Sequence, residues 1–261
     1  MLLYDHPLSP YAQKVRILLR EKGLSFDVQT PEGLGSGVIT DFATLNPRME
    51  VPALVVEGHT ICDSTIIMEF LEDRYPETSM MPTDPFERAQ CRETEEICDT
   101  LYEANNWGLL EVGIFGRGGD IADKLRASAA REISTLNAWL ESRLGENGWL
   151  SGARYGHADI AAIPYVVTAA WLGIAPKPGS PLAGWRERTS ARPAVAETLA
   201  EAKVAFDAMG QYSTALESGV MRRQYRDHRL EWTLRAGGLS VLLEGLERDN
   251  VRFTDIGLFA V

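Results

Sequence analysis

Three short stretches hold residues whose types and spacing could bind and activate a thiol: Ser9 in LSPYA, Val51-Pro52 in EVPAL, and Asp63-Ser64 in CDSTI. Ser9 is followed by proline, which is an ordinary beginning for a helix with serine as the N-cap. The start of a helix also presents free backbone N–H groups and the positive end of the helix dipole. A serine hydroxyl there can donate a hydrogen bond to sulfur and lower the pKa of a thiol. Ser9 could therefore cap a helix, stabilise a thiolate, or do both.

The other two stretches suit the remainder of a short peptide. Pro52 begins an apolar strand, so it is either a strand-edge proline or a cis proline that turns the Val51 backbone outward toward an extended ligand. Asp63 is a favourable N-cap, but its carboxylate could also hold an ammonium group. The Ser64 hydroxyl and the helix N–H groups could hold the neighbouring carboxylate. A peptide with a central thiol and a free amino-acid end fits all three stretches, and glutathione is such a peptide.

The elements that must position these residues alternate over residues 1–76. Apolar runs predict strands at 2–4, 24–28, 53–56 and 60–62, and Gly58 separates the last two as a hairpin. One helical face carries Tyr11, Val15, Leu18 and Leu19, and that helix ends at Gly23. A short helical turn is predicted within 38–45, and another helix after Asp63. The order β-α-β-α-β-β-α predicts a small α/β domain built on one sheet.

The chain changes character after a polar linker that contains three prolines and ends at Pro85. From residue 86 strand signals nearly vanish, and long helical patterns cover 86–112, 120–145, 157–173 and 193–208. The predicted fold class is therefore α/β followed by all-α, with domains at 1–76 and 86–261. A C-terminal extension begins at about residue 210.

The composition is that of a soluble globular protein, because 45% of the 261 residues are hydrophobic and 24% are charged. The formal net charge of −11 argues against nucleic-acid and membrane-surface partners, which favour basic patches. The cysteines at 62, 91 and 98 have neither disulfide nor zinc spacing, so we expect no metal site. We expect a cytoplasmic protein, since there is no signal-peptide pattern and no apolar run long enough to span a membrane.

The stretches SPYAQKVRILLREKGL, NPRMEVPAL and DSTIIMEFLEDRYP, in this order and spacing, resemble the thioredoxin-like domain of cytosolic glutathione transferases. The stretch GHADIAAIPYV is similar to a buried helix of the helical domain in that family, and the resemblance covers roughly residues 1–208. It implies a bacterial, serine-type enzyme with glutathione as co-substrate and Ser9 as the sulfur ligand. It also implies that the Val51 backbone pairs with the cysteinyl unit, that Pro52 is cis, that Asp63 and Ser64 hold the γ-glutamyl end, and that the protein is a homodimer.

Some positions depart from the family pattern or have no assigned contact. Tyr11 is a pocket or core aromatic, and Tyr4, the other back-up thiol ligand, fits better as a strand residue of the core. Arg48 is the single basic residue in the region expected to meet the glycyl carboxylate, and Glu50 beside it is an odd neighbour for an anion.

The family's capping box normally begins with Ser or Thr at the position of Gly156. Asp159 is retained three residues later. The side-chain half of the box is therefore expected to be missing, at a cost of a few tenths of a kcal/mol.

In this family the electrophile binds between the two domains, against the first long helix. Four residues of that helix could line the pocket, although they are more typical of core or dimer contacts: Tyr102, Asn105, Asn106 and Trp107. Three arginines of the extension share a helical face and could meet an anion or form a solvated surface: Arg222, Arg226 and Arg229. The extension could pack over the cleft. Cys62 is expected to be a small buried strand residue, open to oxidation near the site.

We therefore expect a detoxifying glutathione transferase that lowers the thiol pKa and directs the thiolate at a small hydrophobic electrophile, with aromatic compounds among the candidates. Conjugation, ether-bond displacement, dehalogenation and diacid isomerisation stay open. Isomerisation ranks low because LSPYA lacks the serine-rich SSxS turn. The alternatives are a non-catalytic binding protein of the same fold and a glutathione-dependent peroxidase.

Overall fold

A computed structural model describes residues 1–36, 38–212, 218, 230, 233–234, 236–248 and 256–259. Its first part has the predicted order of elements: β1 (Leu2–Tyr4), α1 (Pro10–Glu21), β2 (Asp27–Gln29), α2 (Phe42–Leu45), β3 (Ala53–Val56), β4 (His59–Cys62) and α3 (Ser64–Arg74). Helices make up the elements that follow. The predicted fold class, a thioredoxin-like unit followed by a helical one, is confirmed.

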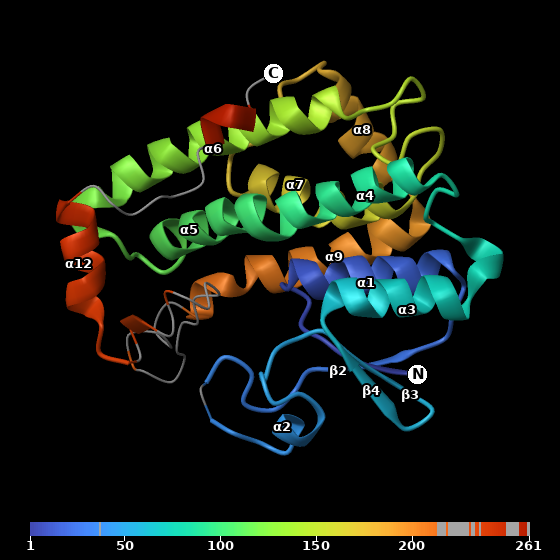
Figure 1. Cartoon of the computed structure of the whole chain (residues 1–261), viewed down its shortest axis with the longest axis horizontal. Coiled ribbons are helices and arrows are strands. Elements are labelled where there is room, and N and C mark those ends of the chain that lie inside the picture. Colours follow the sequence, from blue (N-terminus) through green and yellow to red (C-terminus); the bar gives the residue numbers. More distant parts are fainter. Residues whose placement is uncertain are drawn as a thin grey trace.

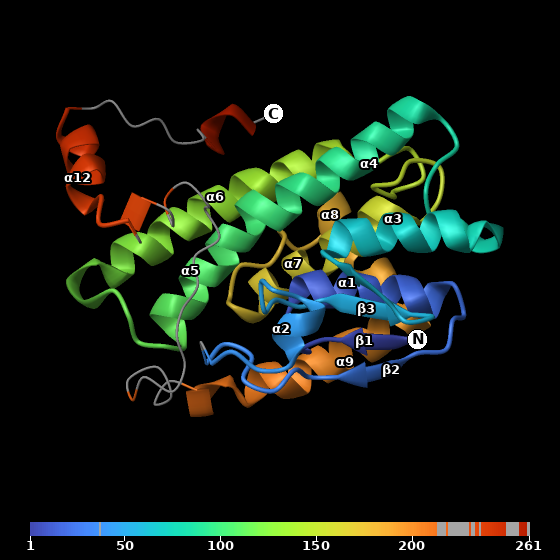
Figure 2. The same cartoon turned by 60° about the horizontal axis from the view of Figure 1, so that its bottom comes forward.

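The four strands form one mixed sheet in the order β2-β1-β3-β4, in which β1 and β2 are parallel and the other two pairs antiparallel. Successive side chains of a strand face opposite sides of the sheet. Leu3 and Leu54 accordingly pack with α1 and α3, whereas Tyr4 and Ala53 pack with Phe42 of α2. Figures 1 and 2 show α1 and α3 on one face and α2 on the other. The core placement of Tyr4 is confirmed.

Strand β2 begins at Asp27 rather than at residue 24. Leu24 and Phe26 are partly buried and pack against the core before the strand begins, so their apolar character reflects packing and not strand pairing. The β3–β4 hairpin is confirmed. Its two-residue turn has φ values of 51° at Glu57 and 81° at Gly58, the left-handed pair that such a hairpin requires.

The helical part follows a short 3-10 turn, η1 (Pro76–Thr78). Its elements are α4 (Pro85–Ile97), the π-helical turn η2 (Cys98–Tyr102), α5 (Glu103–Gly113), η3 (Gly119–Ile121), α6 (Ala122–Ser142), α7 (His157–Trp171), α8 (Pro181–Ser190), α9 (Pro193–Asp207), η4 (Met209–Tyr212), α12 (Leu239–Glu247) and η5 (Ile256–Phe259). The helix predicted at 86–112 is thus interrupted by a π turn. Helix α8 was not predicted, because its pattern is mixed and contains Gly184.

Two described elements of the C-terminal extension, η5 and α12, lie toward α6. The Phe259 ring of η5 packs edge-on against Trp139 of α6, with ring centroids 5.8 Å apart. Figure 1 shows α12 at the end of the molecule where α6 begins, far from the sheet. The predicted arginine face at Arg222, Arg226 and Arg229 lies outside the described residues.

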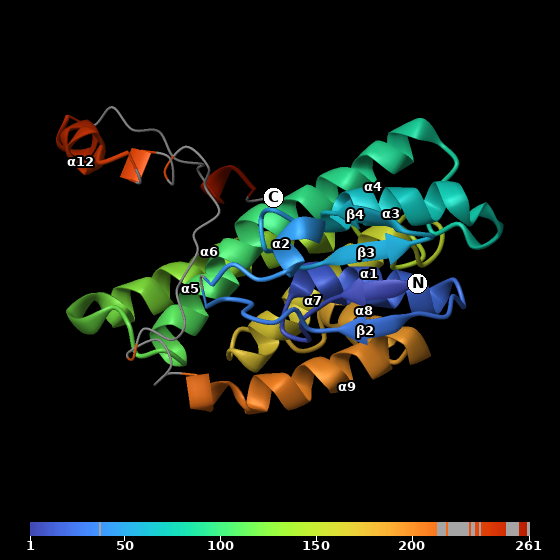
Figure 3. The ribbon, with the colours of Figure 1, turned by 90° about the horizontal axis from the view of Figure 1, so that it is seen from below.

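Helix α1 joins the sheet to the helical part. It packs against α3 on one side and against α7 and α9 on the other, as Figure 3 shows from below. Ion pairs cross this interface. The Arg16 guanidinium pairs with the buried Asp5 and with Glu201 of α9, and Arg192 binds Glu21 through two contacts of 2.8 Å.

Helix α7 runs through the middle of the helical part (Figure 1) and is buried along almost its whole length. Its first turn is held by Asp159, whose carboxylate accepts a hydrogen bond of 3.0 Å from the Gly156 amide. The expected absence of a side-chain cap at Gly156 is confirmed. The Ser151 hydroxyl accepts a hydrogen bond of 3.0 Å from the Ala158 amide, so a neighbouring loop supplies the group that the N-cap side chain lacks.

The linker between the two parts is anchored on α3 by Glu72. Its carboxylate accepts hydrogen bonds from the Ser79 hydroxyl at 2.7 Å and the Met80 amide at 3.1 Å, and it pairs with Lys22 at 2.9 Å. Burial alone raises the pKa of Glu72, but the hydrogen bonds from Ser79 and Lys22 outweigh it and hold the pKa below its usual value of 4.5. Glu72 is therefore ionised in the folded protein at neutral pH.

We expect Glu72→Gln to lower the free energy of unfolding by about 2 kcal/mol at pH 7, because charged hydrogen bonds of this kind contribute about that much. The folded-state pKa lies below the unfolded-state value, so this stabilisation is present above pH 4.5 and is lost as pH falls through the folded-state pKa. Urea unfolding at several pH values should therefore show the two proteins converging in acid. Glu69→Gln, which removes the more exposed pair with Arg92 on the same helix, is the control. If the difference in unfolding free energy between wild type and Glu72→Gln did not change with pH, the assigned role of the ionised Glu72 would be contradicted.

Within the part of the chain that the structure describes, no helix combines the length and the apolar character needed to cross a bilayer.

Candidate functional site

A pocket lies where the end of the loop that precedes β3 meets the start of α3. Its lining residues come from both parts of the molecule: Tyr11, Asn46, Arg48, Glu50, Val51, Pro52, Cys62, Asp63, Ser64 and Asp99. All seven predicted glutathione-binding residues are among them. Ser9, the predicted sulfur ligand, is not among the described residues that line this pocket.

Ser9 is the N-cap of α1. Its φ of −77° and ψ of 113° are extended, Pro10 follows at the first helical position, and its hydroxyl accepts a hydrogen bond of 3.3 Å from the Ala12 amide. The capping role is therefore confirmed. At 3.3 Å the bond is long, and the hydroxyl has a proton with which it can donate to another group. Ser9 is two residues before Tyr11, which lines the pocket.

The Val51–Pro52 peptide bond is cis, as the resemblance implied. Both residues line the pocket, and Asn46 holds the loop that leads to them. The Asn46 amide nitrogen donates to the Glu50 carbonyl at 2.7 Å, and its oxygen accepts from the Arg48 amide at 3.1 Å. Sequence analysis missed Asn46, although an Asn-Pro pair is a turn signal that could have identified it.

Asp63 is the N-cap of α3. One carboxylate oxygen accepts hydrogen bonds from the Thr65 amide at 3.0 Å and the Ile66 amide at 3.4 Å. The capping interpretation is confirmed. Its φ of 79° is rare for a residue with a side chain and is typical of residues held in place at binding sites. Because the cap engages Thr65 and Ile66, the amide and hydroxyl of Ser64 are the donors of this helix start that can face a ligand in the pocket.

Arg48 and Glu50 form an ion pair of 2.9 Å at the rim of the pocket, and the Arg48 side chain is 53% exposed. Glu50 therefore already offsets part of the positive charge of Arg48. An anionic ligand group at this rim would have to share the guanidinium with Glu50, which keeps the glycyl contact unassigned.

Tyr11 belongs to the pocket wall between the two parts of the molecule. Its hydroxyl donates a hydrogen bond of 2.7 Å to the Asp99 carbonyl, and its ring packs edge-on against Tyr165, with centroids 6.2 Å apart. That hydroxyl is directed at the helical part, so Tyr11 contributes its ring to the pocket. Asp99, which sequence analysis missed, lines the same wall. Burial raises the pKa of Asp99, with Lys14 opposing this shift and Glu95 adding to it.

Cys62 is half-buried and lines the pocket, so the expectation of a fully buried strand residue is wrong. Strand β4 ends at Cys62, directly before the cap of α3. Burial raises the pKa of this thiol, Arg48 lowers it, and Asp63 raises it further.

The four residues proposed for the electrophile pocket do not converge. Tyr102 is fully buried and donates to Asn137 at 2.8 Å, and Asn106 is buried and donates to the Tyr165 carbonyl at 3.0 Å. The core interpretation holds for these two. Asn105 faces away from the first pocket and lines a second hollow of about 430 Å³ between α5 and α6.

Trp107 is the member of that set near the Ser9 side of the molecule. It packs on a cluster formed by buried Leu110, Phe115 and Met209, and Leu8 packs on the same cluster. Leu8 directly precedes Ser9 in sequence, so an apolar, partly exposed surface adjoins the start of α1. No motif in the sequence marked this surface, because its members come from the β1–α1 loop, α5 and the end of α9.

The comparisons with known proteins agree with the fold. Residues 3–79 match the family described as "Glutathione S-transferase, N-terminal domain". A maleylacetoacetate isomerase of Pseudomonas aeruginosa is 31% identical over 186 residues, which cover 67% of this chain and 84% of the isomerase. A glutathione S-transferase from Rhodospirillum rubrum has a TM-score of 0.68 at 28% identity, over 76% of this chain and 91% of that one. Another from Methylobacterium radiotolerans, in complex with glutathione sulfonate, has a TM-score of 0.63 at 30% identity, over 76% and 93%.

Proposed function

Because this chain belongs to the glutathione S-transferase family, we propose that it binds glutathione in the pocket at the start of α3 and that the glutathione thiolate forms a bond to a hydrophobic electrophile. One observation carries the proposal. A single pocket brings together the cis-proline segment Val51-Pro52, the capped start of α3 at Asp63-Ser64, and Tyr11 beside the capped start of α1. These groups suit the three parts of a γ-glutamyl thiol peptide. The division into a glutathione-binding unit over 1–76 and a helical unit over 86–261 is part of the proposal.

The chemical work assigned to the chain is positioning and electrostatic stabilisation. The Val51 backbone pairs with the cysteinyl unit, the amide and hydroxyl of Ser64 receive the γ-glutamyl carboxylate, and Asp63 receives the ammonium. The thiol then lies at the start of α1, where the helix dipole and the Ser9 hydroxyl favour the thiolate. The thiol proton passes to water, and the sulfur attacks the electrophile.

The electrophile is proposed to be apolar. The surface that adjoins Ser9 is built by Leu8, Trp107, Leu110 and Phe115, and burial of apolar ligand area is the interaction that such a surface offers. The proposed reaction is conjugation, or displacement of a leaving group, at an aromatic or other hydrophobic compound. The proposed role is detoxification. We place the serine-type enzyme in the cytoplasm as a homodimer, which sedimentation analysis would test directly.

Isomerisation is the second candidate, because the Pseudomonas aeruginosa relative is a maleylacetoacetate isomerase. The LSPYA segment lacks the serine-rich turn that isomerases of this family usually carry. An assay with both a chlorinated nitroaromatic and an unsaturated diacid separates the two candidates. An organic hydroperoxide in the same series tests the peroxidase alternative, and glutathione binding without any turnover would favour a non-catalytic protein.

We expect Ser9→Ala to raise the pKa of the bound glutathione thiol from about 7 toward its free value, because a helix start with a hydroxyl donor favours the thiolate. We expect kcat/KM to fall by about 10²-fold, as when a donor to a developing anion is removed. The ultraviolet absorbance of the thiolate in the complex, followed as a function of pH, measures the thiol pKa. Steady-state kinetics measure kcat/KM.

Ser180→Ala is a matched control for this experiment. Ser180 is also an N-cap followed by proline, and its hydroxyl accepts from the Ala183 amide at 3.2 Å, nearly the same bond as at Ser9. Both variants should lose about 1 kcal/mol of stability through the lost cap, while the thiol pKa should change in Ser9→Ala alone. Equal thiol pKa values in wild type and Ser9→Ala would reduce Ser9 to a helix cap.

A further inference from the structure

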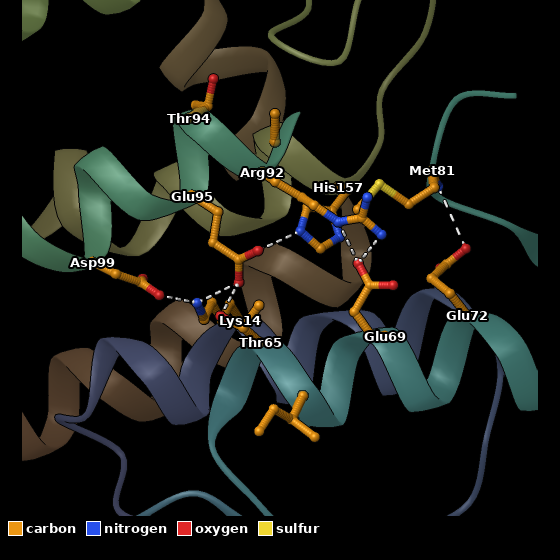
Figure 4. A network of polar contacts seen from close by, with 12 residues as sticks. Lys14, Thr65, Glu69, Glu72, Met81, Arg92, Thr94, Glu95, Asp99 and His157 are labelled. Atoms are coloured by element: carbon orange, nitrogen blue, oxygen red, sulfur yellow. Dashed lines mark hydrogen bonds and ion pairs between the residues drawn. The ribbon is translucent and has the colours of Figure 1, made fainter. Parts of the chain in front are cut away.

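Lys14 is completely buried on α1, yet it keeps its charge. Its ammonium contacts the Glu95 carboxylate at 2.5 Å and the Asp99 carboxylate at 2.5 Å, both from the helical part of the molecule. Burial lowers the pKa of Lys14, but the two carboxylates outweigh it and raise the pKa above its usual value. Figure 4 shows the ammonium between the two acidic side chains. A charge held in this way ties α1 to α4 and to the π turn.

Asp99 is held from three directions. One carboxylate oxygen binds Lys14, the other accepts a hydrogen bond of 2.7 Å from the Tyr165 hydroxyl, and its carbonyl accepts one of 2.7 Å from Tyr11. Lys14 and Tyr11 lie three residues apart on one face of α1, so one helix turn holds both the side chain and the carbonyl of the same residue. Asp99 belongs to η2, and single π turns of this kind are frequent at functional sites.

The Glu95 carboxylate extends the cluster around Lys14 to the Asp63-Ser64 segment at the start of α3. Glu95 accepts a hydrogen bond of 3.0 Å from the Thr65 hydroxyl and contacts the His157 ring at 2.7 Å. Thr65 directly follows Ser64 on α3, and Figure 4 shows these side chains meeting at Glu95. The cluster around Lys14 thus touches residues next to both helix starts that border the pocket.

We propose that Lys14 is a positioning residue of the glutathione pocket, acting through Asp99 and Glu95 to hold the interdomain wall formed by Tyr11 and Asp99. This inference rests on the proposed function. Lys14 does not line the pocket itself, so its effect on the ligand passes through the residues that it holds. Without the ammonium, two buried carboxylates face each other, and the π turn loses the contact that keeps Asp99 against Tyr11.

The test compares Lys14→Met with Lys22→Met. Lys22, at the other end of α1, also has a fully buried side chain and pairs with a carboxylate, Glu72, away from the pocket. Glutathione and S-methylglutathione are titrated calorimetrically into the full chain, and steady-state kinetics are measured. We expect Lys14→Met to raise the dissociation constants of both ligands and KM by about tenfold to a hundredfold. The bound-thiol pKa and kcat should stay close to wild type. Lys22→Met should lose stability with an unchanged dissociation constant.

A second measurement does not depend on glutathione. Hydrogen exchange of residues 95–102 in the ligand-free protein should become faster in Lys14→Met and stay unchanged in Lys22→Met. Lys14→Arg keeps the charge and should recover part of the affinity. If Lys14→Met does not fold, Glu95→Gln takes its place, since it removes an ion pair of Lys14 at nearly constant volume and Glu95 is not among the described residues that line the pocket.

The outcomes separate the inference from the proposed function. A wild-type protein that does not bind glutathione overturns both. A wild type that binds, with Lys14→Met binding as tightly or losing no more affinity than Lys22→Met, overturns the role of Lys14 alone. A loss of kcat and of the thiol pKa shift, with KM unchanged, would place Lys14 in thiolate stabilisation and contradict a positioning role.

Discussion

Asp159→Ala is expected to destabilise the protein by about 4 kcal/mol or more, a large part of the 5–15 kcal/mol typical of a folded domain. Asp159 is fully buried in the first turn of α7. Its carboxylate accepts four hydrogen bonds, from the amides of Leu150 at 2.8 Å, Ser151 at 3.2 Å and Gly156 at 3.0 Å, and from the Trp185 indole at 2.7 Å. Alanine leaves all four buried donors without an acceptor, and each orphaned donor costs about 1–3 kcal/mol.

Urea unfolding followed by circular dichroism measures this loss. Asp159→Asn should be intermediate, because the amide keeps one oxygen but turns an NH₂ group toward donors. Asp84→Ala is the control. Asp84 caps α4 from an exposed position, accepting from Phe86 and Glu87, so its removal should cost about 1 kcal/mol. Similar losses at the two positions would show that the burial of Asp159 adds nothing to its capping role.

Gly156→Ser is expected to destabilise the protein by about 1–3 kcal/mol, although serine is the better N-cap residue by local preference. A Cβ atom at Gly156 would lie 2.3 Å from the Met80 carbonyl oxygen and 3.1 Å from the Ser151 Cβ. The Met80 carbonyl cannot move away without loss, because it accepts a hydrogen bond of 2.8 Å from the His157 amide. The serine that local rules favour would also duplicate the hydroxyl that Ser151 already provides.

Gly156→Ala isolates the steric part of this effect and should be destabilising by a similar amount. Gly108→Ser in the middle of α5 is the control, since a Cβ there meets nothing within 4 Å and should leave stability unchanged or slightly higher. The stabilities of wild type and the variants are compared through their denaturant midpoints, provided that their m values are equal. A Gly156→Ser protein as stable as wild type would mean that the loop carrying Met80 yields easily.

These two positions show how far local rules extend. The helical pattern indicated a helix start before residue 157, and the family resemblance marked Asp159 as half of a capping box. The partner that completes the cap, Ser151, lies seven residues before Ala158 in a loop with no regular pattern. The reason for glycine at 156 is a carbonyl from residue 80, and no local preference can report a contact across 76 residues of chain.

The residues of the pocket at the start of α3 divide in the same way. Ser9, Asp63 and Pro52 were predictable because helix capping and proline geometry depend on a few adjacent residues. Tyr11 was open between core and pocket. Its place was decided by the Asp99 carbonyl, 88 residues away. Asn46 could have been found from its turn signal.

What the sequence by itself determined about this protein is the order of its elements and the helix starts that border the pocket. These follow from periodicity and capping, which act over one or two turns of chain. Only the tertiary structure decided that Asp99 forms a wall of the pocket and that Lys14 is buried. In sequence, Lys14 resembles any cation of an amphipathic helix. Its partners, Glu95 and Asp99, lie 81 and 85 residues later, and folding alone brings those charges together.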